Sequence, residues 1–386
     1  MAISKHVNLL IVGAGPFGLS MAAYAKYKNL DHMVIGKPMS FWKENMPKGM
    51  LLRSGREWHL CPEGIYTIDK YLETKRLKPE DVEPLSLDCY LGYAEWFQEQ
   101  IKAQIRESLV QRLDHSNNQF LATLDDGQII AANDVLLAIG FRYFKNVPTE
   151  LAEIIPPKRF SHTCDLVNFD SLKGKRCLIV GGRQSAYEWA ALINENGAAS
   201  IHVSHRHEIP QFAKSDWAWV SPMMDTMTKN PGWFRNLAKR RRNEIEQRFW
   251  AEGRLKLEPW LWPRINKENI KIWPSSRIVA CTELPTGELE VKLDVGERLN
   301  VDHIILATGY KVNMENVPFL AAGNVLSKLK TKGGSPVLDE NFQCNIPGLF
   351  ITSMAATRNF GNFFAFTVSA VASARIIGEA IKETLT

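Results

Sequence analysis

The sequence predicts an α/β protein in which a strand-helix-strand unit occurs twice, with the second copy inside the first. A buried-strand pattern, a glycine turn and an apolar helix pattern follow one another over residues 6–36, and the same order returns over residues 173–205. Each copy is followed later by two strand patterns around a tight polar turn and a third apolar strand, at residues 120–141 and 289–310, which we interpret as β-meanders. This order indicates an internal duplication of a Rossmann-like, dinucleotide-binding unit.

The duplication predicts two domains, consistent with a length of 386 residues. Residues 1–155 and 306–386 should form the first domain, and residues 156–305 the second, inserted domain. We expect a helical insertion at about residues 207–273, which carries seven of the eleven tryptophans: Trp217, Trp219, Trp233, Trp250, Trp260, Trp262 and Trp273. These side chains either roof a cleft between the domains or fill the core of the insertion.

Composition and charge argue against several classes of partner. The net charge of +5 is mild for this length, and the basic run at residues 239–242 lies beside Glu244 and Glu246, as on a solvated helix face. We therefore predict no nucleic-acid partner. No apolar stretch reaches the roughly 18 residues of a membrane-spanning helix, and the first residues lack the pattern of a signal peptide, so we expect no integral membrane segment.

The six cysteines are scattered, with no C-x-x-C pair among them. This favours a reduced, cytoplasmic protein and argues against a zinc site or a redox-active disulfide. His202, His205 and His207 alternate along and beyond a strand, which is weak support for a metal site, so we predict none. No Ser/His/Asp spacing stands out, and no catalytic residue is predicted.

The first glycine turn, GAGPFG at residues 13–18, lies between a strand and a helix. Gly13 permits the tight turn, Gly15 lets the backbone approach a pyrophosphate, and Gly18 lets the helix pack closely on the strand. The N-terminus of the helix offers unpaired N–H groups to the phosphates. We predict that this turn binds a dinucleotide through Gly13, Gly15, Pro16, Phe17 and Gly18.

The acidic residue that usually holds a ribose hydroxyl after the second strand is absent. The strand HMVI is followed by Gly36 and Lys37. We therefore expect the adenosine ribose to be held by the backbone or by another side chain.

The second glycine turn, GGRQSA at residues 181–186, departs further from the fingerprint, with Arg183 in place of the middle glycine. One interpretation is a structural unit that binds nothing. The other is a nicotinamide dinucleotide site in which the Arg183 guanidinium contacts the phosphates. Arg206 follows the next strand, where a fold that accepts a 2′-phosphate places an arginine. We therefore predict NADPH, with NADH still open, bound through Gly181, Arg183, Gln184, Ser185 and Arg206.

Four segments carry a resemblance to a known group of enzymes: GAGPFG, GGRQSA, LATGY and the C-terminal PGLFITSMAATRNFGNFF. With the nested units, they resemble the class B flavin-dependent monooxygenases, two-dinucleotide-binding-domain flavoproteins that include flavin-containing, Baeyer–Villiger and N-hydroxylating enzymes. The resemblance implies FAD and NADPH as cofactors and puts part of the C-terminal segment near the flavin ring. We accordingly add to the predicted cofactor site Trp42, Gly140, Gly309, Asn359, Phe360 and Gly361.

Part of that group's pattern is missing. Its fingerprint before the second domain has the form F-x-G-x-x-x-H-x-x-x-(Y/W). When it is aligned on His162, the other positions hold Pro156, Lys158 and Leu166. His162 and Thr163 lie where the chain crosses between the units, and a surface or helix-capping role stays as open for them as a cofactor role.

The resemblance also implies an activity. NADPH would reduce FAD, oxygen would add to flavin C4a as a (hydro)peroxide, and a small organic substrate would take one oxygen atom by N-, S- or C-oxidation. Two alternatives stay open: an FAD-dependent NAD(P)H reductase or oxidase without oxygen insertion, and a non-enzymatic flavin-binding redox sensor. The lack of C-x-x-C disfavours a disulfide reductase. The predicted partners are thus a small-molecule substrate and molecular oxygen, with the oligomeric state open.

Overall fold

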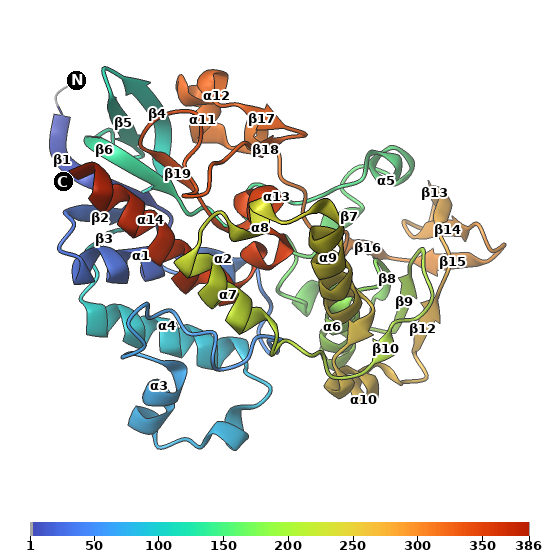
Figure 1. Ribbon diagram of the computed structural model, residues 1–386. Helices are drawn as coiled ribbons and strands as arrows, with labels where there is room; N and C mark the ends of the chain where they lie inside the picture. The colour runs from blue at the N-terminus through green and yellow to red at the C-terminus, as the bar shows by residue number, and fades with distance from the viewer. Residues whose placement is uncertain (1–2, 386) are drawn as a thin grey trace.

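The computed structural model describes residues 3–385, which form two large β-sheets with helices around them and three smaller sheets (Figure 1). The first sheet has seven strands in the order β3-β2-β1-β6-β5-β4, with β19 also paired to β6. Its strands are β1 (Ile3–Val12), β2 (His32–Ile35), β3 (Ile105–Arg106), β4 (Val110–Ser116), β5 (Gln119–Leu124), β6 (Ile129–Leu137) and β19 (Leu349–Ile351). Because β1, β2, β6 and β19 run in parallel, their carboxyl ends share one edge.

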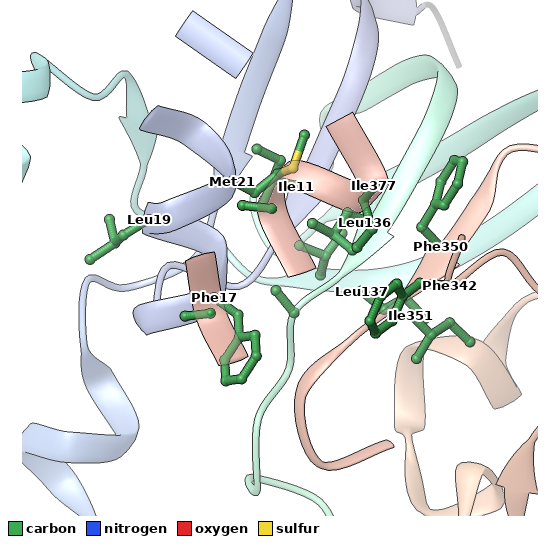
Figure 2. Packing of buried hydrophobic residues seen from close by; sticks show 14 of the residues in the cluster. Ile11, Phe17, Leu19, Met21, Leu136, Leu137, Phe342, Phe350, Ile351 and Ile377 are labelled. Atoms are coloured by element: carbon green, nitrogen blue, oxygen red, sulfur yellow. The ribbon is translucent and has the colours of Figure 1, made fainter. Parts of the chain in front are cut away.

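The first sheet is covered by three longer helices, α1 (Pro16–Tyr27), α4 (Leu87–Ile101) and α14 (Ala370–Leu385). Helix α1 packs against both α14 and α4. Ile11 of β1, Leu136 of β6, Ile351 of β19, Met21 of α1 and Ile377 of α14 belong to one hydrophobic cluster, part of which Figure 2 shows. Residues from the beginning and the end of the chain therefore share one hydrophobic core.

The second sheet is wholly parallel, in the order β12-β9-β8-β16-β7. Its strands are β7 (Phe160–His162), β8 (Arg176–Val180), β9 (Ser200–Ser204), β12 (Ile270–Trp273) and β16 (His303–Leu306). Helix α6 (Gln184–Glu195) connects β8 to β9 and packs on both, as α1 does for β1 and β2. The prediction of an α/β fold with two Rossmann-like units is confirmed.

The two predicted meanders differ in detail from the expectation. In the first, the predicted second and third strands are one strand, β6, because no turn residue interrupts its hydrogen bonding. Its first half pairs with β5 and its second half with β19. The meander is therefore β4-β5-β6 and begins at Val110. In the second, β13 (Ile278–Glu283), β14 (Leu289–Leu293) and β15 (Arg298–Val301) form a separate antiparallel sheet, and β16 enters the parallel sheet.

The tryptophan-rich segment connects the two units. Between β9 and β12 the chain forms β10 (Gln211–Phe212), α7 (Val220–Lys229), α8 (Trp233–Asn236), α9 (Lys239–Arg254), β11 (Lys256–Leu257) and α10 (Trp262–Ile265). Met223, Phe234 and Phe249 of α7, α8 and α9 belong to the core of the first sheet. Leu257 and Ile265 belong to the core of the second sheet. The insertion thus crosses from one unit to the other instead of forming a core of its own.

The remaining elements are short: α2 (Ser40–Glu44), α3 (Ile68–Lys75), α5 (Thr149–Ile154), α11 (Pro318–Ala322), α12 (Val325–Lys328), α13 (Thr357–Phe360), β17 (Thr331–Lys332) and β18 (Ser335–Pro336). Among residues 3–385, no helix has both the length and the hydropathy needed to cross a membrane.

Replacing Gly18 with alanine should destabilise the fold, because a Cβ at this position would overlap the carbonyl oxygen of Gly13. We expect the free energy of unfolding, measured by chemical denaturation, to fall by about 3 kcal/mol. Gly15→Ala is the matched control, since a Cβ there meets no atom within 4 Å and the backbone φ of −86° suits any residue. Equal stabilities of the two variants would contradict the packing role of Gly18.

Candidate dinucleotide-binding cleft

One large cavity, with a volume of about 1160 Å³, is lined by residues of both units. Most of the predicted cofactor-binding residues line it: Gly13, Gly15, Pro16, Phe17, Trp42, Gly140, Gly181, Arg183, Gln184, Ser185, Arg206 and Gly309. Gly18, Asn359, Phe360 and Gly361 are not among its lining residues. Both glycine turns therefore open onto the same space, while the cofactor contacts themselves stay predictions.

The first turn has the form that a bound pyrophosphate requires. Gly13 has φ +115°, and a Cβ on it would overlap the carbonyl oxygen of Ala138 at the end of β6. Gly15 precedes α1, and none of the described side chains caps this helix. The open space at Gly15 and the uncapped helix N-terminus fit the phosphates of FAD.

The absence of an acid after β2 has a steric cause. Gly36 has φ +146°, and a Cβ on it would lie 3.1 Å from the backbone nitrogen of Ala14 in the glycine turn. Lys37 follows with an exposed side chain and lines the cavity. A longer side chain at residue 36 would therefore press against the turn itself.

The second turn repeats this geometry. Gly181 has φ +144°, and a Cβ on it would overlap the carbonyl oxygen of Ala307 at the end of β16. A Cβ on Gly182 would likewise overlap the ring of His205. Helix α6 starts after Arg183, and no described side chain caps it. The backbone of this turn therefore fits a second dinucleotide in spite of its imperfect fingerprint.

The side chain of Arg183 points to the insertion. Its guanidinium donates a hydrogen bond to the carbonyl oxygen of Arg254 and lies 5.1 Å from the ring centroid of Trp250. The next side chain, Gln184, accepts a hydrogen bond from the backbone N–H of Glu258 at 3.2 Å. In this structure both side chains join the second turn to the tryptophan-rich segment, whereas the sequence suggested a phosphate contact for Arg183.

Arg206 has a companion that the sequence did not reveal. Arg206 follows β9 and Arg277 follows β12, and both have exposed side chains that line the cavity. The two strand ends are joined by a hydrogen bond of 2.8 Å between the hydroxyls of Ser204 and Ser276. The sequence did not indicate Arg277 because the long tryptophan-rich segment separates β12 from β9 in the chain. The rule that ligands bind at the carboxyl ends of parallel strands would indicate it.

The predicted C-terminal cofactor residues, Asn359, Phe360 and Gly361, do not line the cavity in this structure. Phe360 is fully buried and stacks on Phe342, with ring centroids 3.7 Å apart. The side-chain amide of Asn359 accepts from the Leu338 N–H and donates to the Pro336 carbonyl oxygen at 3.0 Å. The cavity-lining residues of this part of the chain lie on both sides of residues 359–361: Ser353, Met354 and Thr357 before them, and Asn362, Phe363, Ala365, Phe366, Thr367 and Val368 after them.

His162 and Thr163 have different surroundings. The His162 ring is buried, donates from Nε2 to the carbonyl oxygen of Gly309 at 3.0 Å, and lies with Nδ1 3.1 Å from Cys164 Sγ. Burial lowers the pKa of this ring, which favours its neutral form. Thr163 lines the cavity. His162 therefore joins the chain that enters the second unit to the chain that leaves it at Gly309.

Residues 3–385 contain no group of His, Cys, Asp or Glu side chains that could hold a metal ion.

Glu188 is a buried carboxyl beside the second turn. It is 2% exposed, lines the cavity, and accepts a hydrogen bond of 3.0 Å from the backbone N–H of Leu51 in the other unit. Burial raises its pKa to about 7, against the lowering effects of Leu51 and of Arg264, whose guanidinium lies 3.6 Å away. It is thus an inter-unit contact that titrates near neutral pH.

The tryptophans of the insertion divide between wall and core. Trp217 and Trp250 line the cavity. Trp219 and Trp233 instead pack against the core of the first sheet, and Trp260 against that of the second. Part of the segment therefore lines the cavity, whereas Trp219, Trp233 and Trp260 pack against the cores of the two sheets and not against a core of the insertion's own.

Residues 7–357 match the family described as pyridine nucleotide-disulphide oxidoreductase. The chain belongs to this family. Membership confirms the predicted cofactors, FAD and NADPH.

Individual proteins resemble the chain more distantly. It is 26% identical to ferredoxin–NADP reductase 2 of Shouchella clausii over 52% of this chain and 54% of that protein. It is also 26% identical to probable indole-3-pyruvate monooxygenase YUCCA9 of Arabidopsis thaliana over 79% of this chain and 75% of that protein. The chain thus spans about half the length of the first of these relatives.

A solved structure shares the whole fold. An ornithine N-hydroxylase from Kutzneria sp. 744 matches with a TM-score of 0.80 at 12% identity, covering 99% of this chain and 100% of that chain. This likeness agrees with the predicted architecture of a two-dinucleotide-binding-domain flavoprotein.

Arg206→Gln and Arg277→Gln should each weaken binding of NADP⁺ about tenfold, because a hydrogen bond to a charged group contributes roughly 1.5 kcal/mol. Calorimetric titration of the flavin-loaded protein would measure this. NAD⁺ lacks the 2′-phosphate and serves as the internal control. A similar loss for both nucleotides would contradict the assignment.

Glu188→Gln should change how stability depends on pH. The pKa of about 7 lies above the ordinary value of 4.5, so the folded protein holds this proton more tightly than the unfolded chain does. The stability of the wild-type protein should therefore fall as pH rises from about 4.5 to 7, by about 3 kcal/mol from this group. The glutamine variant keeps the acceptor for Leu51 and should lose this slope in denaturation curves; an unchanged slope would refute the assignment.

Proposed function

We propose that the protein is an FAD-dependent, NADPH-using monooxygenase that transfers one atom of molecular oxygen to a small organic substrate. One observation carries the proposal: both glycine turns open onto one cavity, and none of the six cysteines, all free thiols, lines it. The nicotinamide and the flavin can therefore meet, whereas electrons have no thiol pair through which to leave. The names of the ornithine N-hydroxylase and the plant monooxygenase support the same reaction class.

In this proposal residues 1–155 and 306–386 bind FAD, and residues 156–305 bind NADPH. The backbone at Gly13 and Gly15 leads the FAD pyrophosphate to the N-terminus of α1, and the backbone at Gly181 and Ser185 does the same for NADPH at α6. Arg206 and Arg277 bind the 2′-phosphate.

The cofactors supply hydride transfer and oxygen activation, and the chain supplies position and dryness. Phe249 of α9 lies 6.4 Å from Phe363 and 5.8 Å from Phe366 between ring centroids, and Trp217 lies 5.6 Å from Phe249. All four residues line the cavity. Such an aromatic wall excludes water, which favours oxygen transfer to a substrate over release of hydrogen peroxide.

The second candidate is a reductase that passes electrons to another acceptor, as the name of the ferredoxin–NADP reductase suggests for that relative. Reduction of a disulfide acceptor would need a reactive thiol beside the flavin. Burial raises the pKa of Cys164 and of Cys281 to about 11, so both stay protonated at neutral pH. A quinone or a protein redox centre is an acceptor that would need neither thiol.

The two candidates differ in the fate of oxygen. We expect the FAD-loaded protein with NADPH and ¹⁸O₂ to place one ¹⁸O atom in the product from at least one member of a panel of small amines, thioethers and aromatic acids, measured by mass spectrometry. The control is the same mixture with H₂¹⁸O and unlabelled oxygen, which should leave the product unlabelled. NADPH oxidation that needs an added quinone, with no labelled product, would overturn the monooxygenase.

A further inference from the structure

Arg254, the last residue of α9, carries a cation that lacks a counter-ion. Its side chain is exposed, and the residue lines the cavity. Within residues 3–385, no carboxylate or hydrogen-bond acceptor pairs with its guanidinium. The pKa of this guanidinium is lowered, first by partial desolvation and second by the positive charge of Arg53. An unpaired guanidinium at the edge of a cavity can donate charge-assisted hydrogen bonds to an anion bound there.

The two neighbouring arginines are already engaged. Arg53 donates to Glu258 Oε1 at 3.0 Å and to the carbonyl oxygens of Gly253 and Glu252 at 2.9 and 3.0 Å. Arg183 donates to the Arg254 carbonyl oxygen and stacks over Trp250. Arg254 is therefore the arginine of this group that has its hydrogen-bond donors available.

Helix α9 connects Arg254 with the part of the cavity that Phe363 and Phe366 line. Phe249, Trp250, Gly253 and Arg254 all line the cavity, a spacing that puts them on neighbouring faces of one helix. Gly253 lets the ring of Trp217 lie close, since a Cβ there would be 3.2 Å from that ring. Arg254 lies five positions after Phe249, which corresponds to about 7.5 Å along the helix axis. An anion bound at Arg254 would therefore have the aromatic side chains of Phe249 and Trp250 beside it, at a distance that suits a small molecule.

We propose that Arg254 binds the anionic group of the substrate, and that the substrate is an aromatic or similarly flat, apolar anion such as an aryl carboxylate. This inference rests on the proposed function, because it assigns the substrate class of the same cavity. Two exposed rings at the cavity surface, Phe366 (42% exposed) and Trp250 (51% exposed), supply apolar area for the body of such a molecule.

The phosphates of NADPH are the other source of an anion, and the arrangement favours the substrate. Arg254 belongs to the insertion, whereas the uncapped N-terminus of α6 and the exposed Arg206 and Arg277 already provide for the nucleotide phosphates. Phe249, which precedes Arg254 on α9, approaches Phe363 and Phe366 in the segment that follows Gly361.

Titration of the oxidised, FAD-loaded protein with benzoate and with its neutral isostere benzamide tests this, with the flavin absorbance spectrum as the readout. We expect benzoate to bind the wild-type protein at least tenfold more tightly than benzamide. In Arg254→Gln, benzoate should lose about tenfold in affinity, with benzamide and NADP⁺ changed less than twofold.

Arg248→Gln is the matched control, because Arg248 lies on the same helix, pairs with Asp216 at 3.0 Å and is not a cavity-lining residue. It should leave all three affinities unchanged. Benzoate binding that ignores Arg254→Gln, or no preference for benzoate in the wild type, would overturn the proposal, and so would a tenfold loss of NADP⁺ affinity. Benzoate selectivity that depends on Arg254, without any ¹⁸O-labelled product, would establish the anion site while refuting the monooxygenase.

Discussion

The cleft depends on one close approach, made twice, between a glycine and the end of a parallel strand. Gly13 lies against the backbone of Ala138 after β6, and Gly181 lies against that of Ala307 after β16, both with positive φ values. Any Cβ at these positions would overlap a carbonyl oxygen. With the turns fixed there, α1 and α6 begin at the carboxyl edges of their sheets and direct their N-terminal N–H groups into the cavity.

The way the two units face each other depends on the insertion. Its first part belongs to the core of the first sheet and its last part to the core of the second, so the segment holds both. Arg53 of the first unit binds the carbonyl oxygens at the end of α9, and Arg183 of the second unit binds the next carbonyl oxygen. These bonds put the aromatic side of α9 over the space that both glycine turns share.

What the sequence predicted well is what short-range chemistry determines. Glycine spacing, strand hydrophobicity and the order of the elements are local, and they gave the two units, their nesting and the two turns. The backbone demands at Gly13 and Gly181 recur in every fold of this kind. For the same reason the missing acid at Gly36 was visible at once, whereas its steric cause needed the position of Ala14.

What the sequence could not supply depends on tertiary packing. The Arg183 side chain turns to Trp250 and the Arg254 carbonyl oxygen, 67 and 71 residues further along the chain. Phe360 is buried in the core, where it stacks on Phe342, while residues before and after it in the chain line the cavity. β6 stays continuous because β19, from the far end of the chain, pairs with its second half. None of these partners is indicated by local periodicity.

The central claim is that one cavity brings NADPH and FAD close enough for direct hydride transfer. Anaerobic stopped-flow mixing of the FAD-loaded protein with NADPH, and with NADPH deuterated at the transferred position, tests it most directly. The structure predicts bleaching of the flavin in a phase that saturates with NADPH and is slowed by deuterium. A flavin that stays oxidised at saturating NADPH would contradict the account.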